Sequence, residues 1–591
     1  MKIVLPILLL VVTCMAQLSF YPSFSKAEEL AATYANDFRK TTIELEEIAS
    51  AYKFNQVSQD TLRAMLVRTR NAYKKIEFLL AYYYPEYVDE HINGAPVLHI
   101  KRNDSRAVVI EPQGLQVLDE LINSSSPDKI KIATLAQQLK TNYGVLLTGF
   151  STRKFNTQEW CSAIRLQLVR IFSLGLTGFD TPGSLNAMEE AARSLSGIRE
   201  ITVTFLQEDE TVQLLDSAIT YLQQPVSFND FDRFVFLQKY INPLYTHYYV
   251  YADNNTGWNS ASKNIFSEDF LNPYYYTELR KEEDNKTLRS LGRKLFYDPM
   301  LSSNNKLSCA SCHNPRMAFT DGQDKSASIV KDHPVLRNAP TLLNAVYADR
   351  YFYDLRAFSL EQQAEHVIFN QQEFNTAYEE ILKKLSDNPQ YKQQFKECFG
   401  RGAITRNQFS KALSSYVLSL RSFNSTFDKY VRGESDTTDI TVIKGFNLFM
   451  GKANCGTCHF APTFSGLVPP LYIESESETL GVLQDPDHST VDTDNGRLDN
   501  QLYSEMAWIN EKSFKTTTVR NAALTAPYFH NGAYKTLEQV IDFYDHGGAG
   551  GKGIHIKNQT LSTDSLHLSA TEKHALIAFI GALSDTSILV Q

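Results

Sequence analysis

The chain has 591 residues, of which 43% are hydrophobic and 21% are charged, a composition typical of globular rather than disordered proteins. This length is too great for a single core and predicts about three domains. Lysine and arginine together number 58 against 67 aspartates and glutamates, so the formal net charge is −9. This mild acidic excess argues against nucleic acid as a partner.

The first 16 residues have the pattern of a secretory signal peptide. Lys2 precedes an apolar run over residues 3–13, which is shorter than the roughly 20 residues that a membrane-spanning helix needs. Residues 14–16 (Cys-Met-Ala) then offer a small-x-small cleavage site. We therefore expect an exported, periplasmic protein without a membrane span, and lipid attachment through Cys14 is the alternative.

Residues 20–270 are expected to form a helical domain. In residues 61–84 and 211–223, apolar side chains recur at spacings of three and four, which predicts amphipathic helices. Residues 73–85 are weakly similar to the imelysin-like helical domains of exported bacterial proteins. The aromatic core of a helical bundle is the favoured interpretation of this segment, so no chemistry is assigned to it.

The rest of the chain contains one pattern twice. Residues 291–296 and 444–449 each include the sequence G-x-x-L-F, and they lead to C-x-x-C-H at residues 309–313 and 455–459. This repetition predicts two tandem domains, residues 280–435 and 436–591. The expected fold class is therefore all-α: a helical N-terminal domain followed by two tandem haem domains with long loops, of which residues 474–500 are an example.

The sequence C-x-x-C-H is the attachment signature of c-type haem. Its two thiols bond to the two vinyl groups, and its histidine becomes the proximal ligand of the iron. A redox-active C-x-x-C does not require the histidine, and a zinc site needs further ligands at short spacing. We therefore predict two covalently bound haem c groups, attached through Cys309, Cys312, Cys455 and Cys458 and ligated by His313 and His459. A bridge between the distant Cys161 and Cys398 stays open.

Residues 280–591 resemble the bacterial dihaem cytochrome c peroxidase family, which includes the methylamine-utilisation protein MauG. The motifs that carry the resemblance are the two C-x-x-C-H signatures and residues 291–299, 319–322, 337–341, 360–364, 514–521 and 524–532. The resemblance implies an enzyme that reduces hydrogen peroxide with electrons from an exported donor such as a small cytochrome. It also implies that the first haem is peroxidatic and that the second haem supplies the electrons.

The resemblance implies two catalytic side chains beside the first haem, Gln363 and Glu373. A carboxylate in that pocket can accept a proton from one peroxide oxygen and return it to the other, and an amide can orient the peroxide. Many family members block this iron with a histidine that precedes the Arg-Asn-Ala-Pro motif. The corresponding residue here is Lys331, so we expect an open site, and His333 as a shifted ligand is the alternative.

The resemblance also implies the distal ligand of the second haem. Where the peroxidases have methionine this chain has Tyr544, as in the MauG branch, and tyrosinate is a known haem ligand. His546 is the competing candidate. Tyr353 stands where the family usually has a tryptophan that relays electrons between the haems, and a core aromatic is an equally good interpretation of it.

A calcium ion between the haem domains is a further implication of the resemblance. Asn338, Thr525 and Pro527 match its protein ligands, and oxygen donors suit this cation. Two other functions stay open: a MauG-like oxidase acting on a protein or organic substrate, and an electron-transfer cytochrome without enzymatic activity. A homodimer is also left open.

Overall fold

The computed structural model describes residues 25–101, 104–206, 208–252 and 255–590. The signal peptide predicted at residues 1–16 lies outside the described residues. The protein is mostly α-helical, as predicted, and the described ranges contain two short antiparallel sheets, each of two strands. Every helix in those ranges is too short or too polar to span a bilayer.

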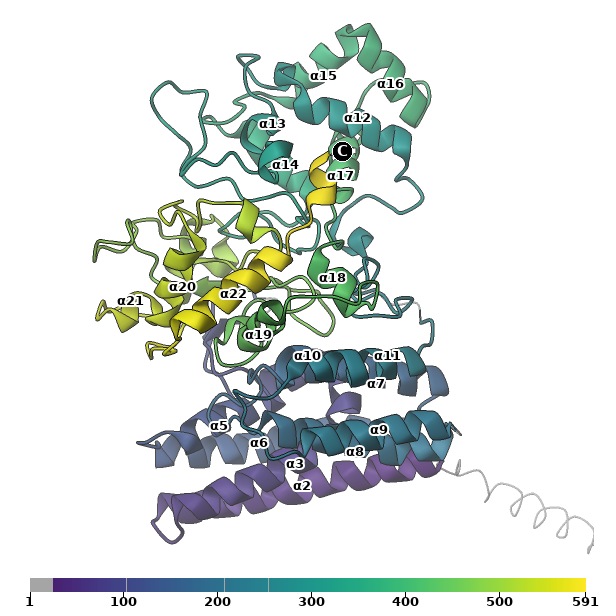
Figure 1. The fold of residues 1–591 in the computed structure, drawn as a ribbon, viewed down its shortest axis with the longest axis vertical. Helices are drawn as coiled ribbons and strands as arrows, with labels where there is room; N and C mark the ends of the chain where they lie inside the picture. The colour runs from purple at the N-terminus through teal and green to yellow at the C-terminus, as the bar shows by residue number, and fades with distance from the viewer. Residues whose placement is uncertain (1–24, 102–103, 207, 253–254, 591) are drawn as a thin grey trace, which may run out of the picture.

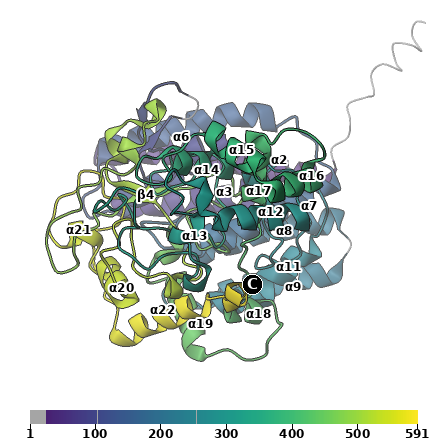
Figure 2. The same cartoon turned by 90° about the horizontal axis from the view of Figure 1, so that it is seen from above.

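The molecule is built of three layers along its long axis (Figure 1). The helices up to residue 247 form one end. The elements from residue 440 onward form the middle, and α12 to α17 form the other end, which the C-terminal turn η12 (Thr586–Val590) also reaches. Seen from above in Figure 2, the layers lie over one another rather than side by side.

The first layer contains the long helices that the sequence predicts. Its helices and helical turns are α2 (Lys26–Lys53), α3 (Gln59–Tyr83), α4 (Pro85–Tyr87), η1 (Val88–Ile92), α5 (Leu115–Asn123), α6 (Lys129–Phe150), α7 (Thr157–Arg170), η2 (Ile171–Gly175), α8 (Ala187–Phe205), α9 (Asp209–Leu222), α10 (Arg233–Phe236), η3 (Leu237–Ile241) and α11 (Asn242–His247), with strands β1 (His99–Ile100) and β2 (Val109–Ile110). Ser25 and Asn156 begin α2 and α7 with capping boxes.

The core of this layer holds a fully buried ionic cluster. Lys74 Nζ lies 2.9 Å from a Glu77 oxygen and 2.7 Å from Asp180 Oδ2, and Arg70 binds both Glu190 and the backbone carbonyl of Asp180. Buried charges are stable only when they are paired and hydrogen-bonded. The cluster therefore ties α3 and α8 to the turn that contains Asp180.

The two haem-motif repeats pack in the same way. In the first, Gly292 of α12 (Lys286–Tyr297) meets Ala412 of α17 (Arg406–Leu418), and the Phe296 and Tyr416 rings lie 5.1 Å apart one turn later. In the second, Gly445 of α19 (Ile440–Phe449) meets Ala575 of α22 (Ala570–Ala582), and the Phe449 and Phe579 rings lie 5.3 Å apart. A side chain at either glycine would collide with the facing carbonyl, so the glycine of G-x-x-L-F is required by close helix packing.

The remaining elements are short and separated by long loops. They are η4 (Pro273–Tyr276), η5 (Pro299–Leu301), α13 (Cys309–Cys312), η6 (Pro315–Met317), α14 (Leu360–Phe369), α15 (Tyr378–Asp387), α16 (Pro389–Phe399), α18 (Thr426–Val431), η7 (Cys455–Thr457), β3 (Ser477–Thr479), η8 (Arg497–Asp499), η9 (Tyr503–Glu505), η10 (Trp508–Asn510), β4 (Ser513–Lys515), η11 (Ala522–Leu524), α20 (Leu537–Asp545) and α21 (Gly548–Gly551). Strand β3 pairs with β4, with Glu478 opposite Phe514.

The bridge between Cys161 and Cys398 that the sequence left open does not form. Both thiols are free, because Cys161 is buried in α7 of the first layer whereas Cys398 lies in α16 at the far end of the molecule.

A buried ion pair joins α18 to the segment that follows β4. Arg520 donates two hydrogen bonds of 2.9 Å to the Asp428 carboxylate, and both side chains are 0% exposed. We expect Asp428→Ala to lower the free energy of unfolding by about 3–5 kcal/mol, because an unpaired charge would remain buried. Asp387→Ala, which breaks the exposed Lys383–Asp387 pair, is the control and should change it little. Urea unfolding tests this contrast, and equal effects would contradict it.

Candidate functional site

One connected cavity contains both C-x-x-C-H motifs. Its volume is about 2110 Å³, and it extends from the end layer that holds α13 through the middle layer to the first layer. Residues predicted from the sequence line it throughout: Cys309, Cys312, His313, Asn338, Tyr353, Gln363, Glu373, Cys455, Cys458, His459, Thr525, Pro527 and Tyr544. Segments more than 200 residues apart in sequence therefore meet around a single space.

The first histidine is held by the backbone that follows it. His313 ends the short helix α13, and its Nδ1 lies 3.1 Å from the carbonyl oxygen of Phe319. Burial lowers the pKa of His313, which favours the neutral imidazole. With Nδ1 donating its proton to a carbonyl, the lone pair of Nε2 is available to a metal, as in many histidine-ligated centres.

The second histidine repeats this arrangement. His459 Nδ1 lies 3.0 Å from the carbonyl oxygen of Thr517 and 3.3 Å from that of Phe464. Burial lowers the pKa of His459 to about 4, so the ring is neutral at neutral pH. The two carbonyls fix the ring orientation from two different segments of the chain.

The four motif cysteines are free thiols on the cavity wall. Burial raises the pKa of Cys309 to about 12, that of Cys312 to about 11 and that of Cys455 to about 12, and it raises the pKa of Cys458 as well. Among the residues that the structure describes, no cluster of three or more His, Cys, Asp or Glu side chains is placed to hold a metal ion. Paired thiols beside a histidine with a free Nε2 in a large cavity fit a haem attached through both sulfurs.

Glu373 lies in the pocket of the first motif. Its charge acts on the thiols of Cys309 and Cys312, and burial raises its pKa to about 7. One of its carboxyl oxygens has no hydrogen-bond partner. Gln363, on α14, lines the same pocket. A carboxyl group that titrates near neutral pH in a buried pocket is suited to exchange protons.

Two further residues of this pocket escaped the sequence analysis. His366 lies one turn after Gln363 on α14, and its ring centroid is 5.8 Å from that of Phe352. Arg356 stacks on the same Phe352 ring, with its guanidinium carbon 3.5 Å from the ring centroid. The positive charge of Arg356 lowers the pKa of Glu373, against the larger effect of burial. His366 and Arg356 reach this pocket through tertiary packing. The only indication of it in the sequence is the spacing of three residues between Gln363 and His366.

An ionic chain leads from Arg356 toward the second motif. Arg356 binds Asp354 at 2.7 Å, Asp354 binds Arg337 at 2.5 Å, and Arg337 binds Asp494 at 2.6 Å. The guanidinium carbon of Arg337 also lies 5.6 Å from the centroid of the Phe514 ring on β4. The domains that contain the two motifs are thereby joined through charged side chains with little exposure.

Tyr353 contacts the segment that holds the second motif histidine. It lines the cavity, its carbonyl accepts a 2.7 Å hydrogen bond from Lys515 N, and its hydroxyl lies 3.5 Å from Asn338 Oδ1. Lys515 is two residues before Thr517, whose carbonyl holds His459. Burial raises the pKa of Tyr353, so the phenol is protonated.

Tyr544 and His546 are placed differently. Tyr544, near the end of α20, lines the cavity, and its pKa is raised by burial and then by the charges of Cys458 and Cys455. His546 is exposed and bonds through Nδ1 to the Asp542 carbonyl of its own helix at 2.6 Å. The charge of the half-buried Glu478 of β3 acts on Cys458 and Tyr544, so the second pocket contains a carboxyl group that the sequence analysis did not single out.

The remaining sequence candidates lie at the edge of the cavity or outside it. His333 and Lys331 are exposed, and neither lines the cavity. Asn338 donates from its backbone to the His530 carbonyl at 2.8 Å and from its side chain to the Gln323 carbonyl at 2.8 Å. Thr525 and Pro527 line the cavity a few residues before His530, so the three predicted calcium ligands come from neighbouring segments.

Comparison with known proteins identifies relatives of about half of the chain. The model of the di-haem cytochrome c peroxidase family matches residues 286–436. The cytochrome-c peroxidase IdrP1 of Pseudomonas sp. (strain SCT) is 33% identical over 323 residues, which is 51% of this chain and 82% of that protein. The cytochrome c551 peroxidase of Nitrosomonas europaea is 34% identical over 260 residues, 44% of this chain and 73% of that protein.

Two other comparisons involve MauG and a solved structure. The methylamine utilization protein MauG of Methylorubrum extorquens is 29% identical over 297 residues, 50% of this chain and 77% of that protein. The crystal structure of a MauG-like protein associated with microbial copper homeostasis aligns with a TM-score of 0.45 at 27% identity, and the alignment covers 53% of this chain and 94% of that one.

The number of haems attached to the chain tests the role of the motif cysteines. We expect the wild-type protein to show two covalent haems per chain in a pyridine haemochrome assay after acid–acetone extraction. The Cys309→Ala/Cys312→Ala double variant should retain one, because the second pair of thiols is intact. The control variant Cys161→Ala/Cys398→Ala should retain two. A wild-type count below two, or loss of haem in the control, would contradict the assignment.

Proposed function

The chain belongs to the dihaem cytochrome c peroxidase family and is an oxidoreductase of that type, and from this premise we propose that it reduces hydrogen peroxide to water at the first motif. In the proposed reaction, one peroxide molecule, two protons and two electrons give two water molecules. A small exported cytochrome or a similar donor supplies the electrons. The observation that carries the proposal is the half-buried Glu373 beside the first pair of cysteines, with one buried carboxyl oxygen that has no hydrogen-bond partner and a pKa that burial raises to about 7.

Two haems, held by the cysteines and the histidine of each motif, would supply the redox chemistry that cleaves the peroxide bond. Side chains of the protein accept and donate the protons. Glu373 accepts a proton from one peroxide oxygen through its unpartnered carboxyl oxygen and delivers it to the other oxygen as water leaves. The Gln363 amide orients peroxide by hydrogen bonding, and the cation of Arg356 favours the carboxylate form of Glu373.

Electrons enter in this proposal at the second motif. Tyr353 lies on the connection between the motifs, since its backbone binds Lys515 on the segment that holds His459. The high pKa of Tyr353 means that oxidation of this residue would require loss of a proton, which its buried surroundings oppose. We assign Tyr353 a place in the electron path because of its contact with Lys515. Because its oxidation must release a proton, we expect it to transfer electrons less readily than a tryptophan would.

A second candidate function rests on Tyr544. A phenolate is a hard anionic donor that stabilises ferric iron and lowers its potential, and Tyr544 is the candidate that lines the pocket whereas His546 is exposed. A second haem with this ligand and a low potential would favour a MauG-like oxidase that oxidises a protein or organic substrate.

We also propose a calcium ion between the two motif domains. Asn338 Oδ1 and the Thr525 and Pro527 carbonyls would bind it and stabilise the contact between these domains.

The pH dependence of peroxide turnover tests the role of Glu373. The carboxylate is the form that accepts a proton, so kcat/KM for peroxide should rise with pH through about 7 and level off above it. Glu373→Gln should lower kcat/KM by about 10²–10⁴-fold and abolish this inflection. The exposed Glu379→Gln is the control and should retain the wild-type profile. A Glu373→Gln variant with the wild-type inflection would show that another group titrates.

The EPR spectrum of the ferric protein tests the role of Tyr544. We expect one high-spin signal from the open first haem and one low-spin signal from the second. Tyr544→Phe should remove or shift only the low-spin signal, and His546→Phe should leave both unchanged. The reverse result would assign the ligand to His546. Low-spin signals from both haems in the wild type would mean that a ligand blocks the first iron and would favour an electron carrier.

A further inference from the structure

The first layer of the molecule lies outside the family match, yet it is in contact with the middle layer. In Figure 1 α10, one of its upper helices, lies beneath α19, the helix that precedes the second C-x-x-C-H, and α11 lies beneath α18. The helical turn η2 contacts η7, which contains that motif, and α10 contacts α19. The first C-x-x-C-H helix, α13, instead contacts α12 in its own layer.

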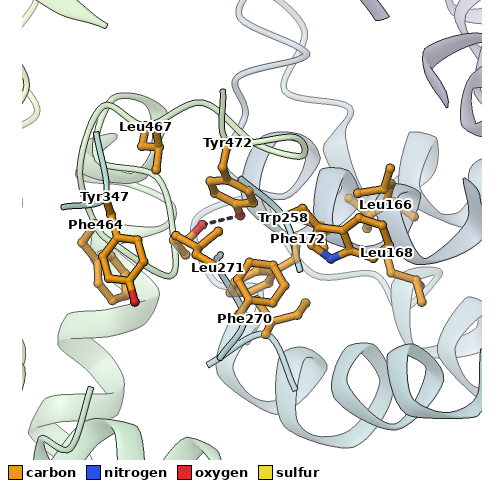
Figure 3. Close-up of a cluster of buried hydrophobic side chains, with 14 of the residues drawn as sticks. Leu166, Leu168, Phe172, Trp258, Phe270, Leu271, Tyr347, Phe464, Leu467 and Tyr472 are labelled. Atoms are coloured by element: carbon orange, nitrogen blue, oxygen red, sulfur yellow. Dashed lines mark hydrogen bonds between the residues drawn. The ribbon is translucent and has the colours of Figure 1, made fainter. Parts of the chain in front are cut away.

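A seam of aromatic side chains fixes this contact. Figure 3 shows Phe172 of the first layer and Phe464 of the middle layer in one buried cluster that also contains Trp258 and Phe270. Phe172 stacks on Phe446 of α19 with ring centroids 6.4 Å apart. Such a seam has the packing of a domain core rather than of a movable interface.

Polar contacts fix the register of the seam. Asn447 of α19 accepts a 3.0 Å hydrogen bond from Phe234 N and donates one of 3.1 Å to Asp232 Oδ1. The side chain of the fully buried Arg233 lies against Gly451, where it leaves no room for a Cβ. The first layer is therefore held in one position relative to the second motif.

The residues that follow η2 reach the motif itself. The Phe179 ring packs edge-on against Phe460, which follows the ligand His459, with centroids 5.7 Å apart. Gly456, between the two cysteines, is buried, and a Cβ at this position would lie 3.0 Å from the sulfur of Met450 in its own layer and 3.1 Å from the methyl carbon of Thr177 in the first layer. Thr177, Gly178 and Phe179 also line the cavity beside Cys455 and Cys458.

The buried ionic cluster of the first layer anchors this segment. Asp180 directly follows Phe179, and it is held by Lys74 at 2.7 Å through its carboxylate and by Arg70 at 2.6 Å through its carbonyl. Asp119 accepts hydrogen bonds from the backbone of Gly183 and Ser184 just beyond it. A segment fixed at both its side chain and its backbone makes a rigid surface.

We propose that the N-terminal helical layer is a wall of the second-haem pocket and covers the haem edge that Cys455 and Cys458 would hold. The two thioether bonds must bring that edge next to these sulfurs, and Gly456 between them faces Thr177. The role of the buried cluster around Asp180 is then to position the wall. This inference rests on the proposed attachment of a haem at the second motif.

The two haems of one molecule provide the test, because the first serves as an internal standard. Ferric EPR spectra and midpoint potentials of both haems are measured on the full-length holoprotein. Phe179→Ala and Asp180→Asn should shift the signal and the potential of the second haem and leave those of the first unchanged. Gly144→Ala is the control, since an added Cβ on that face of α6 meets no atom within 4 Å, and it should shift neither haem.

A pair of variants tests the contact at Gly456 directly. Gly456→Ala should shift the signal of the second haem, because the new Cβ meets both the Met450 sulfur and the Thr177 methyl group. Adding Thr177→Ser removes that methyl group but retains the hydroxyl bond to the Leu174 carbonyl. It should therefore reduce the shift without abolishing it, since the contact with Met450 remains. This pair keeps the proposal testable if Asp180→Asn does not fold.

The proposal is overturned if Phe179→Ala leaves the second haem unchanged, if both haems shift equally, or if the effect of Gly456→Ala is the same with and without Thr177→Ser. Failure of the proposed function is a separate outcome. If the wild-type protein had two haems but no peroxide turnover, the proposed function would be rejected, and every measurement on the wall could still be made. A wild-type protein without haem at the second motif would overturn both.

Discussion

The hydrogen bond from each motif histidine to a backbone carbonyl is the interaction on which the rest of the site depends. It fixes the tautomer and the ring plane, and together with burial it keeps Nε2 unprotonated and directed at the cavity. For His313 the carbonyl belongs to the same loop. For His459 one carbonyl, that of Thr517, comes from the segment after β4, so the second centre requires the long loop of residues 459–517 to be folded.

The two pockets differ in the other titratable groups that line them. The first has a carboxyl group, Glu373, whose pKa is raised into the neutral range because burial outweighs the opposing charge of Arg356. The second has the phenol of Tyr544 beside Cys458. One cavity thus offers a group that exchanges protons near neutral pH at one end and a potential anionic ligand at the other. The ion pairs of Arg337 with Asp354 and Asp494 join the two ends.

Local patterns in the sequence predicted the features that depend on short-range geometry. The G-x-x-L-F repeat predicted two equivalent helices, and the structure shows why its glycines are needed, since Gly292 and Gly445 both pack against a facing backbone. The preference for Tyr544 over His546 came from the family resemblance and not from a local pattern. In the structure residues 537, 540, 541 and 544 line the cavity along one face of α20, whereas His546 lies past the end of that helix.

Features that depend on long-range packing were not predicted. Arg356 and His366 reach the first pocket only because α14 and residues 351–357 fold around the same space. The segment that contains Phe172 and Phe179 has the sequence of an ordinary helical-bundle core. No sequence pattern indicates that these two rings pack against residues 446–460. The buried Lys74 and Glu77, which pair with each other, lie in a segment interpreted as aromatic core. The other carboxylates around Lys74 belong to Asp180 and Glu190, more than 100 residues away in the sequence.

A crystal structure of the haem-loaded protein tests the central claim most directly, that one cavity holds two haems that differ in their distal ligands. The account predicts one iron at Nε2 of His313 with no protein atom bound opposite, and Glu373 facing that position. It predicts a second iron at Nε2 of His459 with the Tyr544 oxygen opposite. A protein ligand on the first iron, from His333 or any other side chain, or a second iron without Tyr544, would contradict it.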